Sequence, residues 1–255
     1  TTYSGMIEVD NISKQFGDKK VLEDVSCVCE QGKINLIIGG SGQGKTVLMK
    51  CVVGWIEVAK GRVLYDGRNF SEMSFGGRKP IRKEIGMLCQ GGALFDSLTV
   101  EQSVTFPLSM FTNMSVAEKR DRANFCLQRV NLENVNKLLP SAISGGMKKR
   151  VAIARAIAMN PKYLFCDEPN SGLDPNTSIL IDELIKEITE EYNITTIINT
   201  HDMNTVMSIG EKIIFIYKGK KYWEGSNNDI MQSQNKELND FVFASRWMKA
   251  VKQHF

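Results

Sequence analysis

One short, glycine-rich segment constrains the fold of this chain more than any other feature of its sequence. It reads Gly39-Gly40-Ser41-Gly42-Gln43-Gly44-Lys45-Thr46 and matches the pattern GxxxxGK[ST] at every required position. An apolar run, Ile34 to Ile38, precedes the segment, and the run Val47 to Val53 follows it. The pattern therefore predicts a loop that joins a buried strand to a helix.

The residue types in this segment suit a site for nucleotide phosphates. Glycines allow consecutive backbone N–H groups to point inward around an anion. Lys45 can then reach the terminal phosphates, and the Thr46 hydroxyl can bind Mg²⁺. A plain glycine-rich turn needs no Lys-Thr pair, so we interpret the segment as a P-loop for ATP and Mg²⁺. A P-loop alone leaves kinases, GTPases and transporter ATPases open.

Size and composition fit one large α/β domain, or one with an inserted subdomain. Of the 255 residues, 42% are hydrophobic and 24% are charged, which is ordinary for a globular protein. The net charge is only +3, and basic residues are spread among acidic ones. Nothing resembles the concentrated positive face that a phosphate backbone favours, so nucleic acid is not an expected partner.

The cysteines and the apolar runs bear on the expected location. The six cysteines form no CxxC pair, and several lie in apolar stretches, as small core residues do. A reducing compartment is the natural inference. No apolar run approaches the roughly 18 residues that span a bilayer, and the start of the chain lacks a signal-peptide core. We therefore expect a cytoplasmic protein, and any pathway across a membrane would belong to another chain.

Strand and helix patterns alternate along the chain and predict an α/β fold. Four β-rich runs in the first third predict an antiparallel β layer beside a core strand: Met6 to Val9, Val21 to Cys29, Ile34 to Ile38 and Arg62 to Tyr65. The region from about Ser103 to Asn160 has helical spacing instead, above all in Ser115 to Val130 and Met147 to Met159. A strand, a helix and a strand follow, in Tyr163 to Cys166, Thr177 to Tyr192 and Ile194 to Asn199, and this order predicts a parallel sheet.

These patterns divide the chain into three predicted parts. Residues 1–90 and 161–236 form the ATP-binding core with its β layer, residues 91–160 form a helical subdomain, and residues 237–255 form a helical tail. Three predicted strands run into polar positions, at Gly39, Asp167 and His201. In α/β sheets, ligands bind beyond the carboxyl ends of the strands, so we expect these three positions to share one site.

An acidic pair follows the strand Tyr163 to Cys166. Asp167 is placed to hold Mg²⁺ through water, and Glu168 can accept a proton from an attacking water. Acidic residues are also common where they cap a following helix. On these two residues alone, both interpretations stay open.

The segment Ser144-Gly145-Gly146-Met147-Lys148-Lys149-Arg150 narrows the choice of family. Together with the P-loop, Gln90 and His201, it resembles the ABC transporter ATPases, whose signature loop reads LSGGQ before a basic helix. The resemblance covers nearly the whole chain. This copy departs from the signature at Ile143 and at Met147 but keeps Ser-Gly-Gly. Small residues at a helix start expose N–H donors and a hydroxyl to a phosphate, although a bare SGG is most often only an N-cap.

The resemblance implies roles for further residues. Phe16 matches the aromatic residue that stacks on adenine, where the family more often has tyrosine; the alternative is a core phenylalanine. Gln90 matches the glutamine that senses Mg²⁺ and water, and His201 matches the histidine that contacts the γ-phosphate. Asp174, in Ser171-Gly172-Leu173-Asp174, matches a loop that links the two ATP sites of a dimer. The alternative is that this segment is a simple turn.

The family's assembly implies partners as well. The signature loop of one subunit closes on the P-loop of another, so the implied unit is a head-to-tail homodimer with two ATP at its interface. The segment Gln90 to Val100 and the variant Met147 look like the ATPases of Mla/Mce-type phospholipid transporters, the MlaF group. The implied partner is then a polytopic permease of that type, at the inner membrane. Importers of amino acids or ions share the same ATP-site motifs and remain the alternative. Soluble ABC proteins without a transport role remain a further class.

The end of the chain leaves two alternatives open. Leu238, Phe241, Val242, Ser245 and Met248 recur at helical spacing. This tail either packs on its own domain or reaches the neighbouring subunit or a small accessory protein, as in the MlaF group.

Overall fold

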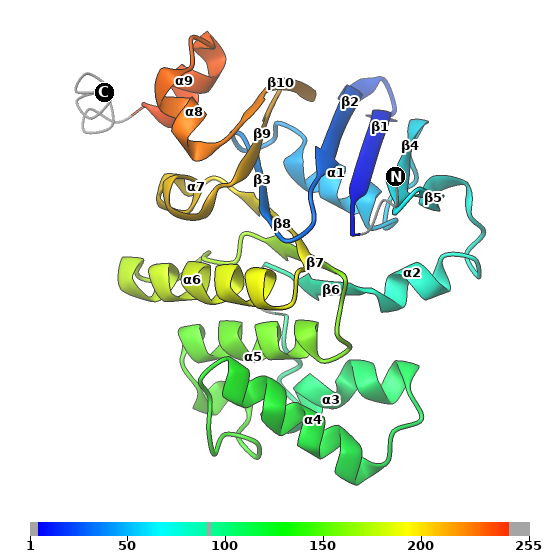
Figure 1. Cartoon of the computed structure of the whole chain (residues 1–255), viewed down its shortest axis with the longest axis vertical. Coiled ribbons are helices and arrows are strands. Elements are labelled where there is room, and N and C mark those ends of the chain that lie inside the picture. The colour runs from blue at the N-terminus through cyan, green and yellow to red at the C-terminus, as the bar shows by residue number, and fades with distance from the viewer. Residues whose placement is uncertain (1–4, 91–92, 245–255) are drawn as a thin grey trace. The chain divides into compact units, whose positions relative to one another are not determined.

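The computed structural model describes residues 5–90 and 93–244 of the chain (Figure 1). It consists of two compact units, one built from residues 1–78 and 195–255 and the other from residues 79–194. The three predicted parts, with boundaries after residues 90, 160 and 236, remain a prediction.

The first unit contains an antiparallel sheet in the strand order β2-β1-β4-β5. Its strands are β1 (Ile7–Phe16), β2 (Lys19–Cys29), β4 (Lys60–Tyr65) and β5 (Arg68–Asn69). In β1 the side chains of Ile7 and Val9 are buried and their neighbours are half-buried, because alternate residues of a strand face opposite sides of the sheet. The predicted antiparallel β layer is confirmed.

A second set of strands in this unit surrounds β3 (Ile34–Ile38). It pairs in parallel with β8 (Thr195–Thr200) and with β9 (Lys212–Tyr217), and β10 (Lys220–Gly225) lies antiparallel to β9. All five residues of β3 are buried, as expected for a parallel strand covered on both faces. The predicted parallel arrangement of β3 and β8 is confirmed. β9 and β10 were not predicted, although the apolar run of residues 213–217 and the Lys218-Gly219 turn after it indicate two strands joined by a tight turn.

The described residues of the first unit also form five helical segments. They are α1 (Lys45–Val52), the 3₁₀ segment η1 (Phe70–Glu72), α7 (Met203–Ile209), α8 (Asn227–Gln232) and α9 (Lys236–Val242). Leu238 and Val242 of α9 are buried in the described part of the tail, while Ser245 and Met248 lie outside the described residues. The start of the predicted tail is thus helical.

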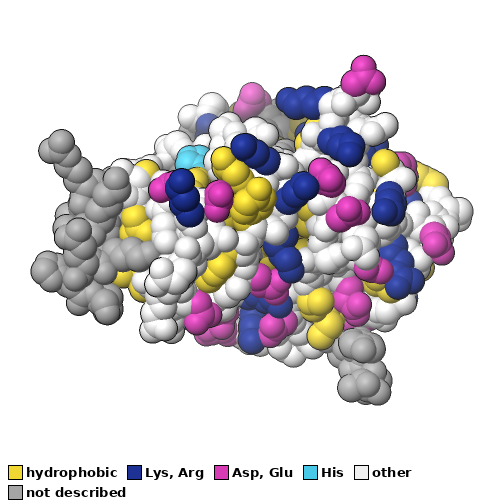
Figure 2. All heavy atoms as spheres, turned by 90° about the horizontal axis from the view of Figure 1, so that it is seen from above, with side chains coloured by type: hydrophobic (Ala, Val, Ile, Leu, Met, Phe, Trp, Pro, Cys, Tyr) yellow, Lys and Arg dark blue, Asp and Glu magenta, His cyan; other side chains and the backbone are white. Residues whose placement is uncertain are grey.

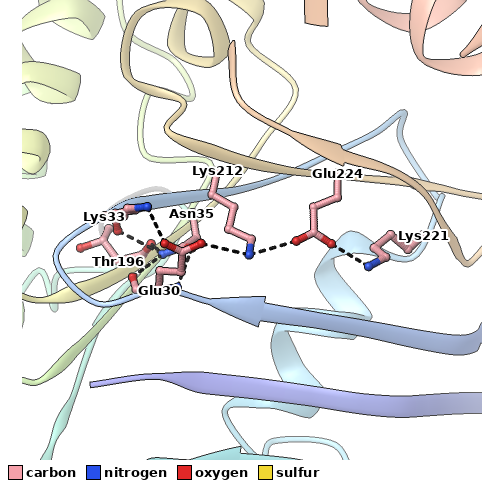
Figure 3. Close-up of polar contacts among 7 residues, drawn as sticks. All are labelled: Glu30, Lys33, Asn35, Thr196, Lys212, Lys221 and Glu224. Carbon is pink, nitrogen blue, oxygen red and sulfur yellow. Dashed lines mark hydrogen bonds and ion pairs between the residues drawn. The ribbon is translucent and has the colours of Figure 1, made fainter. Parts of the chain in front are cut away.

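A chain of ion pairs joins the ends of β2, β9 and β10, as Figure 3 shows. Lys212 Nζ lies 3.3 Å from Glu30 Oε1 and 2.9 Å from Glu224 Oε1. Lys33 and Lys221 pair with the outer oxygens of the same two carboxylates. Burial alone would lower the pKa of Lys212, but hydrogen bonds to Glu224 and Glu30 hold it above its ordinary value. These ion pairs compensate the partly buried charges of Glu30, Lys212 and Glu224.

Outside the two undescribed residues, 91 and 92, the second unit contains two parallel strands and a group of helices. The strands are β6 (Ile85–Leu88) and β7 (Tyr163–Asp167). The helical segments are α2 (Lys79–Lys83), α3 (Val100–Phe111), α4 (Val116–Arg129), the 3₁₀ segment η2 (Pro140–Ala142), α5 (Gly145–Ile157) and α6 (Pro175–Glu191). Figure 1 shows α3, α4 and α5 lying against one another. The predicted helical region between residues 103 and 160 is confirmed, since its described residues form no strand.

Local sequence signals explain where these helices begin. Thr99 and Gln102 form a capping box at α3, and Ser115 and Glu118 form another at α4. Each box satisfies backbone N–H groups that the first helical turn would leave without an acceptor. The starts of both helices therefore follow from residues three positions apart in the sequence pattern S/T-x-x-E/Q.

The cysteines form no disulfide bonds, and the surface carries charges of both signs. All six cysteines are free, and five of them are buried in the units, as small core side chains are. On the face drawn in Figure 2, Lys and Arg side chains alternate with Asp and Glu side chains. Within the described ranges, no helix is both long and apolar enough to cross a bilayer.

Candidate nucleotide-binding site

The glycine-rich segment of the first unit forms a tight loop between β3 and α1. Gly39, Gly42 and Gly44 have φ angles of 151°, 72° and 109°, a region that favours glycine. A Cβ atom at Gly39 would lie 2.3 Å from the backbone oxygen of Ile216. Only glycine therefore allows β9 and the loop to approach each other this closely, and the loop keeps its N–H groups available for an anion.

Lys45 lies inside this loop and is only 7% exposed. Its Nζ donates hydrogen bonds to the backbone oxygens of Gly39, at 2.7 Å, and Gly40, at 3.0 Å. The ammonium is thus held over the loop, where a phosphate group bound by the N–H groups would lie within its reach. The arrangement fits the phosphates of ATP.

Thr46 connects the loop to the end of β8. Asn199 Nδ2 donates to Thr46 Oγ1 at 3.4 Å, while the Thr46 residue itself is exposed. An exposed hydroxyl beside bound phosphates can serve as a ligand of Mg²⁺, which prefers oxygen ligands and keeps several waters. The residues around Thr46 therefore fit the predicted metal position.

Gln43 braces the P-loop, a role that the sequence pattern did not reveal because this position of the motif is variable. Its backbone oxygen accepts a hydrogen bond from Gly219 N at 3.0 Å, and its Oε1 accepts one from Lys218 N at 2.5 Å. The turn between β9 and β10 is therefore fixed to the P-loop from about 175 residues further along the chain.

His201 and Phe16 are both accessible in the first unit. His201 is exposed and lies between the end of β8 and α7, whose N-cap is Asp202. Phe16 ends β1 and is 49% exposed, with Lys14 Nζ 5.4 Å from the centre of its ring. Its exposure makes Phe16 available for stacking on a base and argues against the core alternative.

The acidic pair lies at the end of β7 in the second unit. Asp167 is the last residue of the strand, and Glu168 follows with a φ of 48°, which few non-glycine residues adopt. Both residues are half-buried. The next helix, α6, starts at Pro175 with Asp174 as its N-cap, so the acidic pair does not cap it. This placement favours the chemical interpretation of the pair over the capping one.

Ser144 and Asp174 lie together at the starts of two helices. The Ser144 hydroxyl accepts a hydrogen bond from Met147 N at 3.2 Å, and Asp174 Oδ1 accepts one from Thr177 N at 3.1 Å. Both residues, with Gly145 and Gly146, line a hollow of about 390 Å³. Hydrogen bonds from Thr177 lower the pKa of Asp174, so its carboxylate stays ionised. The N-cap interpretation of Ser144 is correct, and its position also leaves it exposed to a ligand.

Gln90 is exposed and follows Cys89 at the end of β6, while residues 91 and 92 lie outside the described ranges. Beyond them, Arg155 Nη1 donates to the backbone oxygen of Ala93 at 2.9 Å. Burial lowers the pKa of Arg155, although the Cys89 thiol opposes this. An apolar hollow of about 280 Å³ lies beside this contact, and its lining includes Phe95, whose ring centre is 5.7 Å from that of Phe106.

The structure thus assembles two groups of predicted site residues. The first unit holds the P-loop, Thr46 next to the end of β8, His201 and Phe16; the second holds Gln90, Asp167, Glu168, Ser144 and Asp174. Among the described residues, no three His, Cys, Asp or Glu side chains gather as a metal-binding cluster of their own. That the two groups share one site remains a prediction, because their members belong to different units.

Comparisons with known proteins agree with these motifs. A family model described as "ABC transporter" matches residues 22–171. The "Intermembrane phospholipid transport system ATP-binding protein MlaF" of Haemophilus influenzae is 35% identical over 237 residues, which cover 93% of this chain and 90% of MlaF. The "Methionine import ATP-binding protein MetN" of Campylobacter jejuni is 34% identical, over 95% of this chain and 77% of MetN.

A solved structure is similar as well. It is the dimeric post-hydrolysis state of an ATP-binding cassette with bound ADP and Pi. It is 31% identical to this chain, with a TM-score of 0.78, and the match covers 87% of this chain and 98% of the other.

Proposed function

The chain belongs to the ABC transporter ATPases, and on that premise we propose that it powers the movement of phospholipid between bacterial membranes, together with a permease of the Mla/Mce type. As a member of this family it is an ATPase of an ABC transporter, and its cofactors are ATP and Mg²⁺. The identity of the cargo is the part that we propose.

The observation that carries the lipid assignment is the likeness to MlaF over 93% of this chain. The segment Gln90 to Val100 and Met147 after Ser-Gly-Gly are the residues that we interpret as typical of that group. The similarity to MetN is nearly as high, and it favours an amino-acid importer as the second candidate. The residues proposed for ATP do not distinguish the two candidates, because the family resemblance implies the same ATP-site motifs for both.

In the proposed site, the residues of the first unit bind the nucleotide. Phe16 stacks on adenine, and Gly39, Gly40, Ser41, Gly42, Gln43 and Gly44 surround the phosphates with Lys45. Lys45 exchanges its two backbone acceptors for phosphate oxygens, because a phosphate carries more negative charge than a carbonyl. His201 contacts the γ-phosphate.

Residues of the second unit supply the hydrolytic chemistry. Glu168 acts as the general base that accepts a proton from the attacking water. The proposed ligands of Mg²⁺ are Thr46, Gln90 and Asp167, with Asp167 binding through water. When bound, the ion neutralises charge on the β- and γ-phosphates. The exposed side chain of Gln90 allows it to respond to the nucleotide and to a neighbouring protein.

The signature loop completes a site on a second copy in this proposal. Ser144, Gly145 and Gly146 line an open hollow with Asp174, so their donors are accessible to the phosphates of ATP on another subunit. The similar cassette of known structure is dimeric. A head-to-tail homodimer would place two ATP molecules at its interface, and hydrolysis would weaken the closed state.

The apolar hollow around Phe95 is the proposed docking site of the permease. Phe95 is 54% exposed and Phe106 is 42% exposed, while Leu98 is half-buried. An exposed apolar group of this kind is typical of an interface, and it lies just beyond Gln90. Docking there would hold the chain at the cytoplasmic side of the inner membrane as a peripheral subunit. A small accessory protein could complete the complex through the tail.

Phe95→Asp tests the docking site. We expect this variant to remain folded and to bind ATP but to lose co-purification with the permease, because a carboxylate opposes an apolar contact. Phe125→Asp is the matched control, since Phe125 is 47% exposed on α4 of the same unit but lies outside the hollow. Unchanged assembly of Phe95→Asp would contradict the docking assignment.

The cargo is tested on the native complex. We expect the purified complex to contain an Mce-type partner, and extraction of its bound small molecules to yield phospholipid. A complex that contains a solute-binding protein of an amino-acid importer, with no bound lipid, would reject the lipid assignment and favour the second candidate.

A further inference from the structure

A lysine lies over the ring of Phe16, the residue proposed to stack on adenine. Lys14 Nζ is 5.4 Å from the centre of the ring, within the roughly 6 Å at which a cation is attracted to an aromatic face. Both residues belong to β1, and Lys14 is half-buried while Phe16 is 49% exposed. The ammonium therefore covers one face of a ring that is otherwise accessible.

A hydrogen bond fixes the position of this ammonium. Lys14 Nζ donates to the backbone oxygen of Glu57 at 2.6 Å. The Glu57 carboxylate in turn accepts hydrogen bonds from Arg78 Nη1 and Nη2, at 2.6 and 3.0 Å. Arg78 is only 6% exposed, and it also donates to the backbone oxygens of Phe70 and Ser71. The residue that holds Lys14 is thus anchored in the interior of the first unit.

The charge of Lys14 faces the ring and not an acidic partner. Across residues 5–90 and 93–244, Lys14 forms no ion pair with a carboxylate, and no second cation or aromatic ring contacts Phe16. Holding a lysine in one position costs side-chain entropy, and a neutral backbone oxygen does not neutralise its charge. The result of this arrangement is a ring with one face covered and its remaining surface accessible to a base.

A ring that is already held in place binds a base at a lower cost than a mobile ring. Ordering a side chain on binding costs free energy, and this cost is avoided when the free protein already has the bound conformation. The covered face also leaves the base a single face on which to stack. Both effects concern the base of the nucleotide and not its phosphates.

We propose that Lys14 is a positioning residue for nucleotide binding: it holds the Phe16 ring and covers one face of it, so that the base stacks on the opposite face. This role rests on the proposed stacking of Phe16 on adenine. It predicts that Lys14 contributes to the affinity for a nucleotide but not to the affinity for a phosphate chain without a base.

The test compares ATP with inorganic tripolyphosphate, which has no base, by calorimetric titration of the full chain in the presence of Mg²⁺. In Lys14→Met we expect a Kd for ATP about 3-fold higher, as for the loss of one exposed cation–π contact, and an unaltered Kd for tripolyphosphate. Lys14→Arg should retain the affinity for ATP, because a guanidinium also binds a ring face and a backbone oxygen. An equal increase for both ligands would overturn the proposal, since it would assign Lys14 a general effect on the site.

Lys19→Met is the matched control for the loss of a positive charge. Lys19 is exposed and lies opposite Phe16 in the pairing of β1 with β2, but the cation over the ring is Lys14. The Kd of Lys19→Met for ATP should equal that of the unaltered chain. The same loss of affinity in both variants would show that the position over the ring is not what matters, and would also overturn the proposal.

A double-mutant cycle with Phe16→Ala separates this proposal from the one on which it rests. Phe16→Ala should raise the Kd for ATP about 10-fold, and adding Lys14→Met to it should have no further effect. Additive effects, or an unaltered Kd in Lys14→Met alone, would show that Lys14 does not act through the ring, while the stacking assignment would stand. An unaltered Kd in Phe16→Ala would show that Phe16 does not stack on adenine, and both statements would fail.

Discussion

The clearest quantitative prediction concerns Lys45→Ala. In the structure Lys45 Nζ already has two acceptors, the backbone oxygens of Gly39 and Gly40 at 2.7 and 3.0 Å. Binding ATP therefore exchanges these neutral acceptors for charged phosphate oxygens. The energy lost on substitution is the difference between the two sets of hydrogen bonds and not the full worth of either set.

The magnitude follows from typical hydrogen-bond energies. The Lys45 ammonium is charged in both states, and hydrogen bonds that involve a charged group contribute about 1.5–3 kcal/mol each. Exchanging two bonds to neutral carbonyl oxygens, toward the lower end of this range, for two bonds to charged phosphate oxygens, toward its upper end, gives a net loss on substitution of about 2 kcal/mol, which corresponds to a Kd for ATP about 30-fold higher. Hydrolysis should fall further, because negative charge moves toward the leaving phosphates in the transition state.

The assay is calorimetric titration of the chain with ATP and Mg²⁺, together with ATP turnover. Urea unfolding of the free variant checks that the domain remains folded. Lys50→Ala is the matched control, since Lys50 lies in the last turn of the same helix and is half-buried. An unaltered Kd and unaltered turnover in Lys45→Ala would show that the loop is not the phosphate site.

Three further predictions concern Glu168, Ser144 and the ion pair between Lys212 and Glu224. Glu168→Gln should bind ATP and accumulate an ATP-dependent dimer while its turnover, measured by phosphate release, falls by about 10²–10⁴-fold; turnover near the original rate would exclude general-base catalysis. Ser144→Arg should keep ATP binding but lose turnover and dimerisation, and mixing it with Lys45→Ala should partly restore turnover; full activity of Ser144→Arg alone would rule out the head-to-tail site. Although burial alone would raise the pKa of Glu224, its lysine partners lower it below the ordinary value of 4.5, so it stabilises the fold above pH 4.5 and loses this effect as pH falls. Lys212→Met should therefore lower the free energy of unfolding by about 1 kcal/mol at neutral pH, with a smaller difference in acid; a difference that does not change with pH would contradict this.

The sequence by itself determined the features that depend on local pattern. The glycines and the Lys45-Thr46 pair follow a pattern that works only between a strand and a helix, and the structure has β3 and α1 there. The helix starts at Thr99 and Ser115 follow from capping boxes. These elements were predictable because each residue acts on the backbone within four positions of itself.

Only the tertiary structure decided the contacts between distant parts of the chain. The close approach of Gly39 to Ile216, the bond between Asn199 and Thr46 and the brace at Gln43 all join segments more than 150 residues apart. Hydrophobic periodicity predicts which face of a helix or strand is buried, but it does not predict which other segment packs against that face. Lys149 shows this limit most directly: in the sequence it is one of several basic residues after the signature loop, which would ordinarily lie in water. Its burial depends on how α5 packs within the second unit, and no local pattern encodes that packing.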